Sequence, residues 1–65
     1  MVKDFARVLR TKLRADMTRI SDDLSVGVCK SFDEYKHLCG QIHGLALAER
    51  HMMDLLDHLQ QEEDE

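Results

Sequence analysis

The chain has 65 residues, a net charge of −4 at pH 7, and no proline or tryptophan. A chain of this length holds at most one domain and buries only about 60% of its unfolded surface, so a lone monomer is marginally stable. Helix-forming residues dominate, while aromatic and β-branched residues are few, which excludes a β-sheet architecture and predicts an all-α fold.

The sequence predicts neither a set of stabilising disulfides nor a targeting or membrane-spanning segment. Two cysteines, Cys29 and Cys39, cannot form a disulfide framework, so association with another chain is the expected source of extra stability. Residues 1–9 lack the pattern of a signal peptide, and no apolar run reaches the roughly 18 residues of a membrane span. We therefore expect a soluble protein with no membrane partner, located in the cytoplasm of the producing cell.

The first predicted helix covers about residues 4–24, because apolar residues recur there at spacings of three and four on one face. The opposite face is charged. Gly27 follows this segment and is well placed to adopt the left-handed conformation that ends many helices. The apolar face consists of Phe5, Leu9, Leu13, Met17, Ile20 and Leu24.

The second predicted helix covers about residues 31–60 and is followed by an acidic, frayed tail over residues 61–65. Ser31 at the N-cap and Glu34 three residues later form a Ser-x-x-Glu capping box, which is the sharpest local signal in the chain. Together the two segments predict a single domain over residues 1–65. Its expected architecture is a two-helix antiparallel hairpin with a longer second helix, assembling into a helical bundle.

The second helix has an apolar stripe wider than the seam of a two-stranded coiled coil, which indicates more than one neighbouring helix. Beside it, Gly40, Gly44 and Ala48 follow one another at intervals of four, although each glycine costs about 1 kcal/mol relative to alanine. They indicate either close approach of another helix or a break near residues 39–44. We predict a continuous helix, because the apolar periodicity passes through the glycines unchanged. The stripe comprises Tyr35, Leu38, Ile42, Leu45, Met52, Leu56 and Leu59, with Glu49 as its one charged member, and it is widened by Ala46, Ala48, Met53 and Leu55.

The expected register of the hairpin places Glu49 opposite Ala6, so either Arg7 or Arg10 is expected to pair with the Glu49 carboxylate. The same register leaves the last leucines of the second helix beyond the start of the first, with nothing in their own chain to cover them. The predicted partner is a second copy of the chain, forming a homo-oligomer, or a different protein. The predicted interaction residues are Leu55, Leu56, Leu59, Met53 and Ala48.

Charge is segregated, since residues 1–20 hold six basic and two acidic residues while residues 49–65 hold one basic and seven acidic. Antiparallel pairing lays these segments side by side and neutralises both. The alternative signal is a basic stripe on the first helix, because helically spaced cations can bind the phosphates of nucleic acid. The negative net charge makes this interpretation the weaker one. The stripe consists of Lys3, Arg7, Arg10 and Arg14.

Residues with catalytic or metal-binding chemistry form no strong pattern. Cys29, Cys39 and His43 could supply three zinc ligands, but their spacing matches no common zinc motif. A second group occupies solvent-facing positions of the second helix, without a pocket to desolvate it, and consists of His51, Asp54 and His58. We therefore expect no metal, no cofactor and no enzymatic activity.

Residues 31–56, SFDEYKHLCGQIHGLALAERHMMDLL, resemble short helical-hairpin proteins encoded by tailed bacteriophages. The resemblance covers residues 4–59 and rests on a basic first helix, a Ser-Phe-x-Glu-Tyr start of the second and a Gly-Leu-Ala-x-Ala-Glu-Arg centre. It implies a structural protein of the virion or of its assembly, in contact with portal, capsid or tail proteins. It carries over no catalytic residue.

The expected architecture is also similar to that of plasmid repressor-of-primer proteins, two-helix hairpins that dimerise into a four-helix bundle and bind RNA. Similarity of fold alone does not establish function. The leading hypothesis is therefore a noncatalytic helical interaction module, and a small RNA-binding or host-regulatory hairpin is the alternative.

Overall fold

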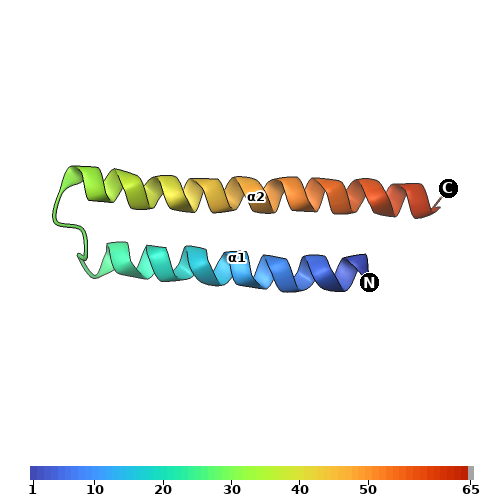
Figure 1. Cartoon of the computed structure of the whole chain (residues 1–65), viewed down its shortest axis with the longest axis horizontal. Coiled ribbons are helices and arrows are strands. Elements are labelled where there is room, and N and C mark those ends of the chain that lie inside the picture. The colour runs from blue at the N-terminus through green and yellow to red at the C-terminus, as the bar shows by residue number, and fades with distance from the viewer. Residues whose placement is uncertain (65) are drawn as a thin grey trace.

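The computed structural model describes the backbone of residues 1–64 and the side chains of residues 1–61. It consists of two helices, α1 (Val2–Ser25) and α2 (Phe32–Asp64), joined by a short connection. The helices run antiparallel, so both termini lie at the same end of an elongated molecule of 53 × 17 × 12 Å (Figure 1). The predicted all-α hairpin with a longer second helix is confirmed.

The end of α1 is closed by backbone hydrogen bonds and by one glycine. The N–H groups of Val26 and Val28 donate to carbonyl oxygens of Asp22 and Asp23, at 3.1 and 3.2 Å. Gly27 between them has a φ of +76°. This left-handed conformation strains residues with a Cβ, so the predicted role of Gly27 as a helix terminator is confirmed.

The start of α2 is held by the capping residues, with one difference from the prediction. The backbone N–H of Glu34 donates to Ser31 Oγ at 3.1 Å, as a capping box requires. The Glu34 carboxylate, however, accepts a hydrogen bond from the backbone N–H of Lys30 at 2.8 Å, one residue before the cap. Both side chains therefore stabilise the first turn, and Glu34 also ties the connection to α2.

Both helices are longer than predicted. α1 begins two residues earlier than expected, and α2 continues through Gly40 and Gly44 without a break, which confirms the continuous helix. The structure continues α2 to Asp64, through residues 61–64 of the predicted frayed tail. Gln and Glu are good helix formers and no glycine or proline intervenes, so nothing in that segment stops the helix. Glu65 lies outside the described residues.

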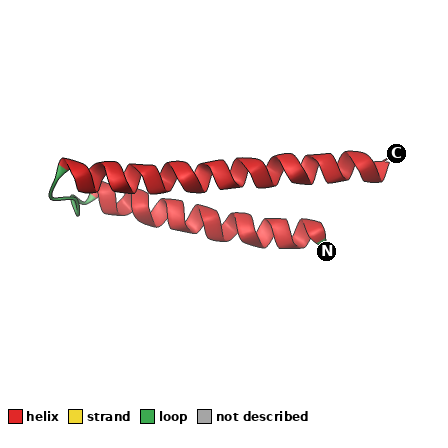
Figure 2. Cartoon of the chain, turned by 45° about the horizontal axis from the view of Figure 1, so that its top comes forward, coloured by secondary structure: helices red, strands yellow, loops and turns green. Residues whose placement is uncertain are grey.

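The connection between the helices sets a register that differs from the predicted one. Figures 1 and 2 show that α2 begins beyond the end of α1, because the connection runs along the long axis before it turns back. Asp16 consequently lines a groove with Leu45, and Lys3 lines another with Leu56. The facing residues of α2 are thus shifted by about one helical turn from a symmetric hairpin.

The contact between the helices forms a thin core. Within residues 1–61 only Ala6 and Ile20 are buried. The other apolar residues of the predicted stripes are at most half-buried, since each helix has a single neighbour. The half-buried apolar side chains are Leu9, Leu13, Met17, Leu24, Leu38, Ile42, Leu45, Met52, Met53 and Leu56.

Candidate functional site

Glu49, the charged member of the apolar stripe, is held by two arginines of α1. Arg14 Nε and Nη2 each donate to a Glu49 carboxylate oxygen at 2.7 Å, and Arg10 Nε lies 3.7 Å from the same carboxylate. The Glu49 side chain is only 13% exposed. Hydrogen bonding from Arg14 lowers the pKa of Glu49, against the opposing effect of desolvation, and the same bond raises the pKa of Arg14. The carboxylate is therefore satisfied as an anion.

The predicted partners of Glu49 need correction. Arg10 is a secondary partner, whereas Arg7 is 3.6 Å from Asp4 on its own helix and does not reach Glu49. Arg14, the main partner, was not predicted. It lies one turn beyond Arg10 on the same side of α1, so the one-turn shift in register brings it within reach. Extending the set of possible partners of Glu49 by one helical turn, from Arg10 to Arg14, would have included the main partner.

The basic stripe predicted as a phosphate site is largely engaged within the chain. Arg10 and Arg14 converge on Glu49, and Arg7 pairs with Asp4. Lys3 lines a small groove of about 140 Å³ in which Met53 and Leu56 of α2 also take part. A phosphate group bound here would compete with the mostly buried Glu49 carboxylate for two of the four cations, whereas the Arg7–Asp4 pair is exposed and weak.

The five predicted interaction residues fall into two groups. Leu55 and Leu59 are 64% and 41% exposed, and Ala48 is also exposed. Met53 and Leu56 are half-buried and line the groove against the start of α1. The prediction that Leu56 projects beyond α1 is therefore wrong, because the shifted register brings Lys3 opposite it. Figure 1 shows that only the last part of α2 extends past the N-terminus.

The glycines of α2 face open space. A Cβ added at Gly40 or Gly44 would meet no heavy atom within 4 Å, so the close helix approach that they predict is not made by α1. Gly44 instead lines a groove of about 390 Å³ together with residues of both helices. We call the following exposed row on α2 the glycine–leucine line: Gly40, Gly44, Ala48, Leu55 and Leu59.

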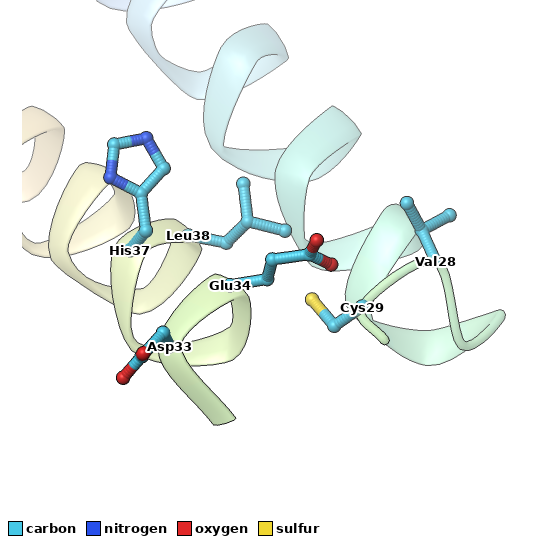
Figure 3. Close-up of a pocket in the computed structure, with 6 residues that line it drawn as sticks. All are labelled: Val28, Cys29, Asp33, Glu34, His37 and Leu38. Carbon is cyan, nitrogen blue, oxygen red and sulfur yellow. The ribbon is translucent and has the colours of Figure 1, made fainter. Parts of the chain in front are cut away.

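A second apolar hollow, of about 380 Å³, lies at the bend of the hairpin. Figure 3 shows Cys29 from the connection turned toward Glu34 and Leu38 of α2. Burial, and after it the negative charge of Glu34, raises the pKa of the Cys29 thiol. The thiol is thus held in its protonated, less nucleophilic form. The full lining is Val28, Cys29, Asp33, Glu34, His37 and Leu38.

The other residues weighed for chemistry are two half-buried cysteines and exposed histidines of α2. Cys29 and Cys39 are free thiols. In the part of the chain that the structure describes, no three His, Cys, Asp or Glu side chains gather closely enough to hold a metal ion. His43 and His51 are exposed on α2.

Comparison of the chain with family models, with curated proteins and with solved structures finds no match. Among the described residues, neither helix has the length and apolar character needed to cross a membrane. Evidence about function therefore comes from the surface of the hairpin itself.

That surface is large for the size of the molecule. The chain exposes 5365 Å², whereas a typical folded monomer of 7.6 kDa exposes roughly 4,300 Å². The excess, roughly 1,000 Å², is comparable with the area of about 800 Å² that each partner buries in a standard protein interface.

Proposed function

We propose that this protein is a noncatalytic helical interaction module that associates through the exposed apolar surface of its hairpin. The observation that carries this proposal is the thin core, in which Ala6 and Ile20 alone are buried among residues 1–61. A two-helix hairpin with so little buried area has too small a core for independent stability. Association supplies the missing burial.

Energetics favour coverage of the open end of the hairpin. Phe5 and Leu55 are 72% and 64% exposed. Fully burying a side chain of this size contributes roughly 1.5–3 kcal/mol, so a few of them suffice to stabilise a domain of this size. Patches of such residues on soluble proteins are typical of binding surfaces.

The first test is the oligomeric state of the purified chain over a range of concentrations. Light scattering after gel filtration and sedimentation velocity should show a homo-oligomer, and the thermal midpoint should rise with concentration. A stable monomer whose midpoint does not depend on concentration would contradict self-association. A monomer that is poorly folded and gains structure only with a cell extract would point to a different protein as the partner.

The biological setting that we propose is bacteriophage assembly, in the cytoplasm of the producing cell or in the virion. Support comes from the resemblance of residues 4–59 to phage-encoded hairpins. The test is mass spectrometry of purified virions and of assembly intermediates, with portal, capsid and tail proteins as candidate contacts. Absence of the chain from both would remove this setting and leave the interaction module.

Nucleic-acid binding is a weaker candidate, because Glu49 engages Arg10 and Arg14, two of the four cations that would contact phosphate. Fluorescence anisotropy with duplex and hairpin RNA at low salt should show no saturable binding. Steeply salt-dependent binding that is lost in Arg7→Ala or Arg10→Ala would reverse this order.

A further inference from the structure

We propose that two copies of the chain pack α2 against α2 in antiparallel orientation, with Leu55 of each copy seated in the groove beside Gly44 of the other. This proposal rests on the proposed function and specifies its partner and geometry. The contact surface is the glycine–leucine line, which α1 leaves uncovered.

The glycine–leucine line follows one side of α2. Its members are separated by four, four, seven and four residues, spacings that stay on one side of a helix with 3.6 residues per turn. None of the five is charged, and the exposed His51 lies on the same side of α2, seven residues after Gly44 and four before Leu55. Met53, which contacts the Lys3 groove, lies nine residues after Gly44, or about two and a half turns, and so occupies the opposite side of α2.

The two halves of the line have complementary shapes. The first half has glycines at 40 and 44, where a Cβ would meet nothing within 4 Å. The second half has Leu55 and Leu59, which are 64% and 41% exposed. The groove beside Gly44 has a volume of about 390 Å³, and a cavity of about 150 Å³ already holds a benzene molecule, so a leucine side chain fits.

Antiparallel orientation is the arrangement that joins these halves. A two-fold axis between Ala48 and His51 places Gly44 of one copy opposite Leu55 of the other, because both lie equally far from the axis. By the same spacing Gly40 faces Leu59. Parallel packing would set glycine against glycine and leucine against leucine, which leaves the grooves empty. Large residues packed against small ones fill space more completely.

The polar rim of the groove already has partners within its own chain. Arg19 Nη2 lies 3.8 Å from Asp16 Oδ1, and Gln41 Nε2 lies 3.2 Å from a ring nitrogen of His37. An entering leucine therefore leaves neither the ion pair nor the amide without a partner. The excess surface of roughly 1,000 Å² per copy, counted over the whole hairpin, is enough to supply a standard interface.

Disulfide trapping tests the orientation. In a Cys29→Ser, Cys39→Ser background, one chain carries Gly40→Cys and a second carries Leu59→Cys. After mixing and mild oxidation, the mixed disulfide should exceed either self-linked product by at least tenfold. Efficient self-linking of the Leu59→Cys chain would instead show parallel packing and overturn the proposal, because antiparallel copies hold these positions roughly 30 Å apart.

A groove-filling variant tests the contact independently. Gly44→Leu should raise the dimer dissociation constant at least tenfold and keep its helix content, since the added side chain occupies the site of Leu55. His43→Leu adds the same side chain one position earlier, on a different side of α2, and should leave the constant within about twofold. Unchanged affinity in Gly44→Leu overturns the proposal.

The same measurements distinguish self-association from the antiparallel geometry. A wild-type chain that is a stable monomer at all concentrations overturns both self-association and this geometry. A wild-type dimer with parallel cross-links, or one insensitive to Gly44→Leu, overturns the geometry alone and leaves the interaction module standing.

Discussion

The two sides of α2 differ in whether residues of the same chain bind or cover them. On one side Glu49 is bound by Arg10 and Arg14 of α1. On the other, a Cβ added at the glycines of the glycine–leucine line would meet no heavy atom within 4 Å, and the leucines of the line are exposed. Long arginine side chains can reach across a two-helix contact to a single charged group. An apolar row that points away from the only neighbouring helix can be covered only from outside.

The largest expected effect comes from charging the uncovered side. Leu55→Asp with Leu59→Asp should raise the dissociation constant of the oligomer by at least 100-fold, because each buried leucine contributes roughly 1.5–3 kcal/mol. Helix content should fall as well, since the released hairpin has little core. Gel filtration with light scattering and circular dichroism measure both effects.

A matched control for this pair is Val8→Asp, which adds a carboxylate at an exposed apolar position of α1, away from the glycine–leucine line. It should remain oligomeric. If the double variant behaves like this control, the leucines do not form the interface and the two sides of α2 do not differ as proposed.

The next largest effect concerns the Arg14–Glu49 pair. Arg14→Ala should lower the thermal midpoint more than Glu49→Leu does, because it leaves a mostly buried carboxylate with Arg10 as its only cation. Glu49→Leu should leave the midpoint unchanged or raise it. A large loss of stability in Glu49→Leu would mean that the carboxylate also contacts a partner.

Substitutions of glycine should change the free energy of unfolding by a smaller amount, with stabilisation at Gly44 and destabilisation at Gly27. In dilute, dissociated samples Gly44→Ala should raise the free energy of unfolding by about 1 kcal/mol, because alanine is the better helix former and the space is open. At high concentration the gain should shrink, since the methyl group narrows the groove. Gly27→Ala should cost about 1–2 kcal/mol, because its φ is +76°. Urea denaturation of both variants and the wild type, at a low and a high protein concentration, measures these changes in the free energy of unfolding.

The smallest expected effect is the pH dependence of the stability that the Arg14–Glu49 pair contributes. The folded chain lowers the pKa of Glu49 from its usual 4.5, mainly through hydrogen bonding to Arg14. The pair therefore contributes its full stability above about pH 4.5 and loses it as the pH falls through the lowered pKa. The stabilities of wild type and Glu49→Gln should differ most above about pH 4.5 and converge as the pH falls through the lowered pKa of Glu49 in denaturation curves. A gap that widens on acidification would contradict the assignment.

Much of the local structure follows from the sequence alone. The 3.6-residue spacing of apolar residues determines two helices, and Ser31, Glu34 and Gly27 determine where they meet, since capping and left-handed conformations depend on neighbouring residues only. Exposure of Leu55 and Leu59 could also be predicted, because the second helix is longer than the first. Phage assembly and the identity of any partner stay predictions.

Only the tertiary structure determines the axial register between α1 and α2. The path of the connection shifts the facing residues by about one turn, which selects Arg14 over Arg7 as the partner of Glu49 and moves Leu56 into contact range of α1. It also decided that α1 leaves Gly40 and Gly44 uncovered. Helical spacing shows which residues share a face, but it does not contain the axial offset between two helices, which depends on the geometry of the whole connection and on side-chain packing.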